Sequence, residues 1–238
     1  MRDSFSVAHG GPIVPLQFTR SAFARVFTQR CFWLFAALLL LIVTVPFAAQ
    51  SAGGRIAVNS INVLVLLAAI AAVGRSLLSF MIGLMLALPT VAFQLLGIGT
   101  GEPRYLTLSW IFGGAFYFAA IVYLLRYVFS REAISVDKLY GAAALYLMLA
   151  VLWAYLYGIA QHYFPGSFTA GGGAVGAVAG PDLIYFSFTV LTTTGFGDIT
   201  AVLPLARTLV TLEQVTGTLF VAILIARLAG VYPEQRGR

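Results

Sequence analysis

The stretch that decides the fold lies at residues 181–198 and reads PDLIYFSFTVLTTTGFGD. Pro181 and Asp182 form a helix-start signal with an acidic residue in the first turn. The apolar helix predicted from Leu183 to about Thr192 rises only about 16 Å, which is half of a bilayer's hydrocarbon core. A segment of this length enters a membrane and must return on the same side. The return strand is predicted at 193–198.

The backbone of this return strand needs an environment that satisfies its polar groups, because non-helical backbone at membrane depth is tolerated only inside protein or along water. Gly195 and Gly197 alternate with larger residues and permit angles that are closed to other residues. A backbone in which left-handed and right-handed residues alternate turns successive carbonyl groups toward one axis. One strand cannot surround an ion, whereas four around a fourfold axis supply rings of carbonyl oxygens. The preceding helix points the negative end of its dipole at a cation there.

The rest of the chain has the composition of a polytopic membrane protein. Hydrophobic residues make up 61% of the 238 residues and charged residues only 9%, against about 25% charged in soluble domains. This excludes a soluble enzyme, a DNA-binding protein and a peripheral protein. The single cysteine, Cys31, excludes an intrachain disulfide, and two histidines leave little for zinc chemistry.

Six membrane spans are predicted from five charge-free stretches and from a last apolar stretch that contains Arg207, Glu213 and Arg227. They lie near 32–49, 57–74, 77–97, 107–129, 139–160 and 205–229. Six spans place both termini on one side, and eleven of the fourteen Lys and Arg residues then share that side. This bias predicts cytoplasmic termini. A cleaved signal peptide is the alternative for the first span, and its long apolar run argues against it. Segment 20–30 is either an interfacial helix or an unstructured tail.

Between the last two predicted spans, the sequence resembles the potassium-channel family. That family's filter reads Thr-Val-Gly-Tyr-Gly-Asp, and here the stretch 193–198 reads Thr-Thr-Gly-Phe-Gly-Asp. Thr194 departs from the commoner valine or isoleucine. The resemblance covers about 139–230 and implies an outer helix, a pore helix, a filter and an inner helix.

The resemblance also implies roles for single residues. The carbonyls of Thr193, Thr194, Gly195 and Phe196, with the Thr193 hydroxyl, would bind K⁺, and Gly197 completes the filter. Asp198 would lie behind the outer mouth and bond to the pore helix. Tyr185 stands where the family usually has a tryptophan with this task, and Thr189 where some members have a glutamate.

The last predicted span carries several candidate residues. Gly217 stands where the family often has a hinge glycine, although a glycine there also permits close helix packing. Helical spacing from this glycine predicts one face that lines a water cavity below the filter. The members of this face are Gln214, Thr218, Val221 and Ile225.

Glu213 is an ionisable residue inside a predicted span, and such residues are functional candidates by default. It does not share the Gln214 face, so we expect it to point at the pore helix or a neighbouring subunit. The hydroxyls of Thr189, Thr192 and Tyr185 are its candidate partners. A hydrogen-bonded brace behind the filter, with the carboxyl protonated, is the favoured role, and a proton-sensitive gate is the alternative.

The domain organisation follows from the spans. Residues 1–30 are expected to be a cytoplasmic segment and 31–130 a four-helix domain like a voltage sensor. The predicted fourth span has only Arg126 near its cytoplasmic end, whereas a sensing helix needs several arginines. Residues 131–138 connect to the pore domain at 139–230, and 231–238 form a cytoplasmic tail.

The expected fold is an all-α integral membrane protein with six spans, a re-entrant pore helix and a filter between the fifth and sixth. The expected function is a homotetrameric, voltage-independent potassium channel of the plasma (inner) membrane. The alternative is a weakly selective or non-selective cation channel of the same architecture. An enzyme, a cofactor other than the permeant K⁺, a nucleic-acid partner and a soluble ligand domain are not expected.

Overall fold

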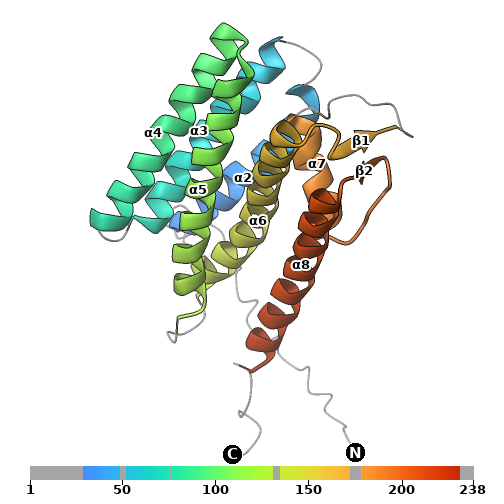
Figure 1. The fold of residues 1–238 in the computed structure, drawn as a ribbon. Helices are drawn as coiled ribbons and strands as arrows, with labels where there is room; N and C mark the ends of the chain where they lie inside the picture. Colours follow the sequence, from blue (N-terminus) through green and yellow to red (C-terminus); the bar gives the residue numbers. More distant parts are fainter. Residues whose placement is uncertain are drawn as a thin grey trace, which may run out of the picture.

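The computed structural model describes residues 29–48, 52–74, 77–130, 135–171, 178 and 180–230. It is helical apart from one short hairpin (Figure 1). The elements are, in chain order, α2 (Arg30–Ala48), α3 (Ala52–Val73), α4 (Leu77–Thr100), α5 (Pro103–Val128), α6 (Val136–Tyr163), β1 (Phe168–Ala170), α7 (Gly180–Leu191), β2 (Ile199–Ala201) and α8 (Pro204–Gly230).

Five helices within the described residues are long and apolar enough to cross a bilayer, namely α2, α4, α5, α6 and α8. These five of the six predicted spans are confirmed by length and composition. The remaining predicted span falls on α3, whose apolar part, Ala57–Ala72, is shorter. The count of six spans therefore stays a prediction.

Helix α6 is the centre of the structure. Figure 1 shows it running between the α4–α5 pair and α8. Its N-terminus is capped by Ser135, whose side chain accepts a hydrogen bond from the backbone N–H of Lys138. Buried side chains lie all around the helix, including Leu145, Met148 and Tyr157. A helix that is apolar on every side is typical of a span surrounded by other spans.

The start of α6 is also a junction of three helices. One carboxylate oxygen of Asp137 accepts from the backbone N–H of Cys31 in α2 at 3.0 Å, and the other accepts from the Tyr127 hydroxyl of α5 at 2.7 Å. Near the far end of α8, Arg227 donates to the Ser130 carbonyl at 2.6 Å and lies over the ring of Phe129 at 4.8 Å. This end of the molecule is tied together by polar contacts.

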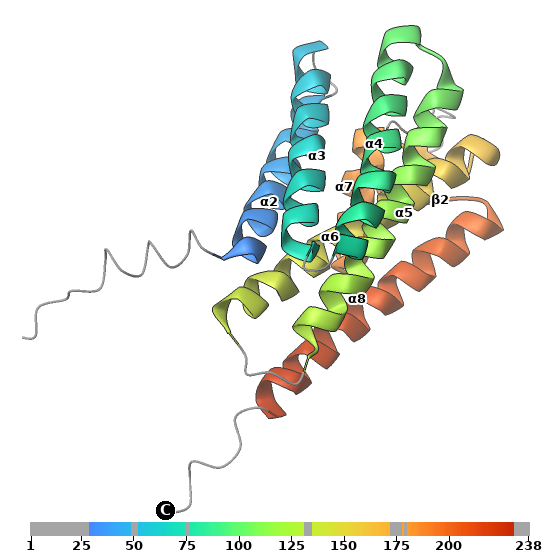
Figure 2. The same ribbon diagram turned by 90° about the vertical axis from the view of Figure 1, so that its left-hand side faces the viewer.

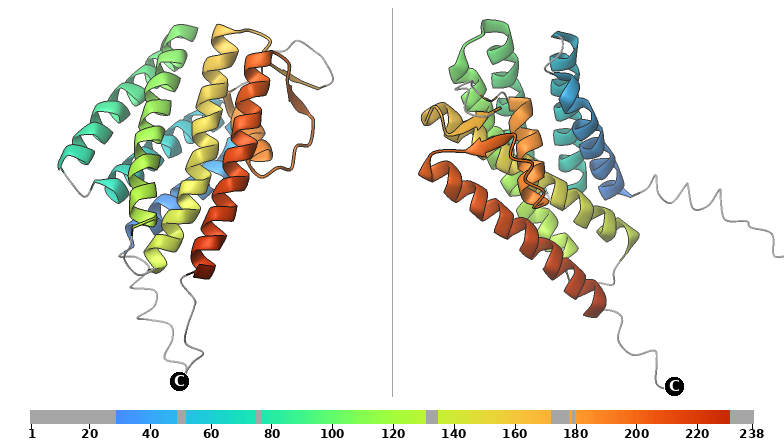
Figure 3. Two further views of the ribbon diagram at one scale, coloured as in Figure 1. Left: turned by 60° about the horizontal axis from the view of Figure 1, so that its bottom comes forward. Right: turned by 90° about the vertical axis from the view of Figure 1, so that its right-hand side faces the viewer.

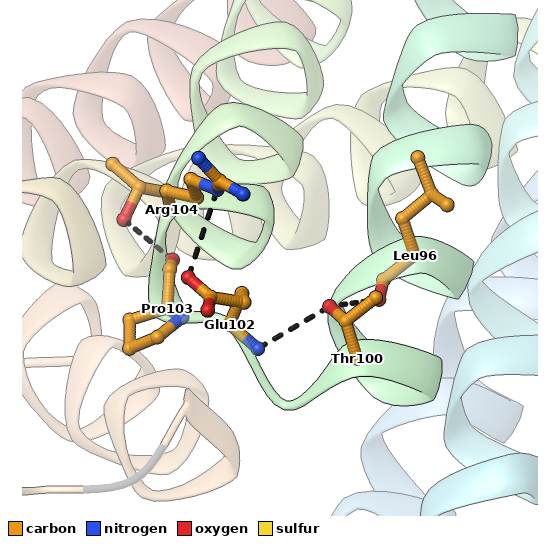
Figure 4. A network of polar contacts seen from close by, with 6 residues as sticks. Leu96, Thr100, Glu102, Pro103 and Arg104 are labelled. Carbon is orange, nitrogen blue, oxygen red and sulfur yellow. Dashed lines mark hydrogen bonds and ion pairs between the residues drawn. The ribbon is translucent and has the colours of Figure 1, made fainter.

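At the opposite end, a short turn joins α4 to α5 (Figure 4). The Thr100 hydroxyl donates to the Leu96 carbonyl at 2.7 Å and accepts from the backbone N–H of Glu102 at 3.3 Å. Pro103 then begins α5, a position where its missing N–H costs nothing. An exposed ion pair joins Glu102 to Arg104 at 3.6 Å.

Helix α7 has only 12 residues and spans about 18 Å. Figure 3 shows it behind α8, and the chain between them passes through the hairpin. Strands β1 and β2 pair antiparallel, with Phe168 opposite Ala201 and Ala170 opposite Ile199. The sequence analysis missed this hairpin, because three-residue strands are too short for their alternation to be recognised.

Several sequence predictions lie outside the described residues. These are the N-terminal segment with its candidate interfacial helix, most of the connector at 131–138, most of the glycine-rich run at 171–176 and the tail at 231–238.

Candidate functional site

The segment 192–198 follows α7 directly and has an alternating backbone. Thr193, Gly195 and Gly197 have φ angles of 57°, 55° and 80°, all in the left-handed region. Among the non-glycine residues that the structure describes, Thr193 alone has a positive φ. Such angles cost a non-glycine residue about 1–2 kcal/mol. Every second residue is left-handed, and this alternation turns successive carbonyls toward a common side.

Hydrogen bonds to the end of α7 hold this segment in place. The Thr189 carbonyl accepts from the backbone N–H groups of Thr194 at 2.9 Å and Gly195 at 3.1 Å. The Val190 carbonyl accepts from the N–H of Thr193 at 2.9 Å. The orphan carbonyls at the end of the helix thus bind the strand that follows, so the chain turns back along α7.

The threonine hydroxyls at the inner end of the segment differ in their partners. Thr192 donates to the Phe188 carbonyl at 2.7 Å, and its hydroxyl oxygen lies 2.9 Å from that of Thr194. In the described part of the chain, the Thr193 hydroxyl has no hydrogen-bonding partner. An unpartnered hydroxyl beside carbonyl oxygens is suited to binding a cation.

The outer end of the segment is anchored through Asp198. Its carbonyl accepts from the N–H of Gly171 at 2.9 Å, and its carboxylate accepts from the N–H of Ile199 at 3.0 Å. The side chain of Tyr185 in α7 lies near the same carboxylate and interacts with it electrostatically. The rings of Tyr185 and Phe196 stack with centroids 6.4 Å apart and planes 3° from parallel. Both ends of the segment therefore contact α7.

Within this single chain, every residue of 192–198 is exposed, and the Phe196 side chain is 69% exposed. An added Cβ at Gly195 or Gly197 would meet nothing within 4 Å. In a single chain, the space around these glycines therefore does not exclude a side chain. The constraint on both positions is their φ angle.

Glu213 of α8 lies in a second polar cluster behind α7. Its side chain is fully buried, and its two carboxylate oxygens accept from the hydroxyls of Tyr157 in α6 and Ser187 in α7. The Ser187 hydroxyl also lies 2.7 Å from the Ala150 carbonyl of α6. Within the described residues, no basic side chain pairs with Glu213. Three helices are joined through one carboxyl group.

The predicted partners of Glu213 were wrong. Tyr185 and Thr189 lie one turn apart on one face of α7, whereas Ser187 lies on the opposite face, since each residue advances 100°. That opposite face packs against α8. Tyr185 instead reaches Asp198, and Thr189 donates its hydroxyl to the Phe186 carbonyl at 2.8 Å.

At Gly217, the backbone of α8 lies close to the end of α7. A Cβ at this position would lie 2.4 Å from the Leu191 carbonyl oxygen and 2.9 Å from the Leu191 Cδ1 atom. The same carbonyl accepts from the Tyr146 hydroxyl of α6 at 3.2 Å. The geometry therefore gives Gly217 a packing role, and its role as a hinge stays a prediction.

The predicted cavity face of α8 is exposed in the single chain. A different side of α8, with the buried residues Glu213, Gly217 and Phe220, faces α6 and α7. The predicted cavity residues lie on the uncovered remainder of the helix, and they are Gln214, Thr218, Val221 and Ile225. This surface is uncovered by the chain's own helices.

Sequence reasoning missed Tyr157 and Ser187. A buried acid demands hydrogen-bond donors, so their existence could be inferred from Glu213. Their identity could not, because it depends on how α6, α7 and α8 rotate against one another.

Residues 143–233 match the model of a protein family described as an ion channel. The matched stretch begins within α6 and includes α7, the segment 192–198 and all of α8, and it is less than half of the chain. Searches of the curated proteins and of the solved structures found no significant match.

This part of the chain is therefore similar to an ion channel domain, and the described residues also include several helices of membrane-spanning length. The coarse prediction of an ion channel in a membrane is supported by this match.

Proposed function

We propose that this chain is the subunit of a homotetrameric, potassium-selective channel. One observation carries the proposal, which is the left-handed backbone at Thr193, Gly195 and Gly197 on a strand bonded to the end of a half-length helix. Four such strands around one axis supply rings of carbonyl oxygens that replace the hydration shell of K⁺.

In this proposal the ion sites are the carbonyls of Thr193, Thr194, Gly195 and Phe196 and the hydroxyl of Thr193. Helix α7 is the re-entrant pore helix, and the negative end of its dipole points at the ion path. The exposed face of α8 with Gln214 and Thr218 lines the water cavity. No cofactor takes part besides the permeant ion.

The helices α2–α5 form a domain like a voltage sensor without its charges. The described helix α5 has Arg104 and Arg126 as its basic residues, one near each end. Conduction is therefore proposed to be nearly independent of voltage. The channel lies in the plasma (inner) membrane with both termini cytoplasmic, as the distribution of Lys and Arg indicates.

A weakly selective cation channel is the second candidate, and Thr194 favours it because the family commonly has an aliphatic residue there. Reversal potentials under a K⁺ gradient against Na⁺ separate the two candidates.

The decisive experiment compares Gly195→Ala with Gly101→Ala in a liposome flux assay under a K⁺ gradient. Both glycines have a positive φ, 55° and 71°, and open space around an added Cβ. Both substitutions cost about 1–2 kcal/mol per chain. Only Gly195 lies in the proposed filter, and four copies would meet in one ring.

We expect Gly195→Ala to abolish selective K⁺ flux, while Gly101→Ala conducts like the parent. Thr193→Ala should conduct with weakened ion affinity, since the carbonyls remain. The mass of each conducting species in detergent should be that of a tetramer. If Gly195→Ala conducts K⁺ with unchanged selectivity, the segment 193–198 is not the filter.

A further inference from the structure

A cavity of about 390 Å³ lies away from the proposed ion path, between the helix pairs α2–α3 and α4–α5. Figure 2 shows the two pairs side by side, with α6 and α7 behind them. The cavity is lined by residues of all six of these helices. A volume in this range is typical of ligand sites.

The floor of the cavity has a network of neutral polar side chains. The Asn62 amide nitrogen donates to the Tyr155 hydroxyl oxygen at 3.2 Å and lies 3.5 Å from the Gln94 side-chain oxygen. The Tyr117 hydroxyl donates to the Asn62 carbonyl oxygen at 3.2 Å. Gln94 in turn donates to Asn59. The network joins α3, α4, α5 and α6.

Every amide oxygen of this network accepts a hydrogen bond, whereas several of its donors have no acceptor. In the described part of the chain, the Tyr155 hydroxyl accepts a bond but its own proton has no acceptor. Among the same residues, the indole N–H of Trp110 and the amide N–H₂ of Asn59 also have no partner. All three side chains line the cavity. Three unused donors in an apolar cavity call for a ligand that has acceptor oxygens.

The lining also excludes a charged ligand group. All lining residues are described, and none of them is Asp, Glu, Lys or Arg. The walls around the donors are apolar and include Leu41, Val151 and Ile184. Ile98 at the rim is 48% exposed, so the cavity opens where lipid would lie. The ligand is therefore neutral at its recognised end and apolar elsewhere.

The depth of the cavity fits lipid esters. Gly97 and Leu106 of the lining lie three residues from the adjoining ends of α4 and α5, a rise of about 4.5 Å. Asn59 lies seven residues into α3, about 10 Å from its start. This is the boundary between the hydrocarbon core and the interfacial region, where the ester carbonyls of glycerolipids lie.

We infer that this cavity binds the acyl-glycerol ester region of a membrane lipid, through the donors of Tyr155, Trp110 and Asn59. Gly180 and Pro181 at the start of α7 form part of the same wall, so the bound lipid contacts the helix that precedes the segment 192–198. The inference rests on the cavity alone, and its binding test does not depend on ion conduction.

Tryptophan fluorescence in proteoliposomes tests this inference, because Trp110 lies in the cavity. The chain has three tryptophans. The variant Trp33→Phe/Trp153→Phe keeps Trp110 as the reporter of the cavity. The variant Trp110→Phe/Trp153→Phe keeps Trp33, whose side chain is 47% exposed, as the reporter of bulk lipid. The probes are diacylglycerol and phosphatidylcholine with brominated acyl chains, and a brominated alkane without an ester.

We expect quenching of Trp110 to saturate at a mole fraction of brominated diacylglycerol several-fold below that needed for Trp33. Equal saturation by brominated phosphatidylcholine would identify an ordinary phospholipid as the source of the ester, whereas selective saturation by diacylglycerol would identify the neutral lipid. Adding Tyr155→Phe to the Trp110 reporter should raise the half-saturation point about 2- to 10-fold. Tyr163→Phe, at an exposed position of the same helix, should leave it unchanged.

Two results would overturn the inference. One is quenching of Trp110 that follows Trp33 for every ester probe, and the other is equal saturation by the brominated alkane. Native mass spectrometry of the unsubstituted protein adds a check that needs no variant. A retained acyl-glycerol lipid after delipidation supports the site, and its complete absence at saturating diacylglycerol contradicts it.

Discussion

The two faces of α6 carry two polar clusters of different chemistry. On the pore side, Tyr157 donates to the buried carboxyl group of Glu213, which also meets Ser187 of α7. On the other side, Tyr155 accepts from Asn62 in a network of neutral amides and hydroxyls. The two tyrosines are two residues apart, so they point to nearly opposite sides of the helix.

The difference between the two clusters shows that α6 takes part in two separate sets of contacts. The acid cluster has few members and joins α7 to α6 and α8, so each lost contact loosens the helix that precedes the segment 192–198. The amide cluster spreads over four helices and borders a cavity, so its loss acts on helix packing. We therefore expect pore-side changes to alter conduction, and changes on the other side to alter stability.

The largest effect is expected for Gly217→Ala on the pore side. Its Cβ would overlap the Leu191 carbonyl oxygen at 2.4 Å, and backbone atoms cannot move aside as a side chain can. Overpacking of this kind costs about 1–3 kcal/mol per chain or more. K⁺ flux per reconstituted protein should fall to background, and the proposed tetramer should dissociate at a lower temperature.

Gly114→Ala is its matched control on the other side of α6, since the added Cβ would lie 3.7 Å from the Tyr155 Cβ, an ordinary contact. Its flux and thermal midpoint should match those of the parent. Parental flux in Gly217→Ala would show that α8 moves away from α7 in the conducting state.

An intermediate effect is expected for Glu213→Leu, which leaves the buried Tyr157 hydroxyl without its acceptor. Such an orphaned group costs about 1–3 kcal/mol. Potassium selectivity, measured from reversal potentials, should weaken together with the thermal midpoint. Glu213→Gln should behave like the parent, because an amide accepts from Tyr157 and can donate to Ser187.

The Gln variant also reports on the protonation of Glu213. Two hydroxyl protons serve three acceptor oxygens in this cluster, and a proton on the carboxyl would satisfy every contact. A Glu213→Gln channel that loses selectivity as fully as Glu213→Leu would contradict a protonated brace and favour a charged carboxylate.

The smallest effects are expected for the pair Tyr157→Phe and Tyr155→Phe. Each removes one hydroxyl and keeps the ring, and a single hydrogen bond is worth about 1 kcal/mol. Both should lower the thermal midpoint by a few degrees. Only Tyr157→Phe should shift the reversal potential toward that of Na⁺. Equal shifts of the reversal potential in both variants would contradict a functional difference between the two faces of α6.

Much of this molecule could be predicted from sequence because its signals are local. Charge-free stretches mark the long helices, and the half-length helix with its Gly-Phe-Gly strand marks the segment 192–198. The left-handed angles at Gly195 and Gly197 follow from glycine itself. The same angle at Thr193 could not be foreseen, since hydrogen bonds to the end of α7 impose it.

The side-chain contacts between helices that are distant in the sequence could not be predicted from the sequence. Glu213 was recognised as a buried acid, but its partners depend on helix rotation, which no local pattern records. Asn62 and Gln94 stand 32 residues apart and drew no attention, because an isolated amide in a span has no motif. Their role can be recognised only in the structure, where they lie together beside a cavity.

At each end of α8, an arginine side chain donates to a backbone carbonyl, and this arrangement affects which positions can be substituted. Arg207 donates to the Ala201 carbonyl at 3.3 Å, and Arg227 donates to the Ser130 carbonyl at 2.6 Å. A main-chain carbonyl is present whatever the side chain, so positions 201 and 130 can drift in sequence without losing either contact. We therefore expect the two arginines to be the constrained positions, and a lysine, with a compact ammonium group in place of a planar guanidinium, is a poor replacement.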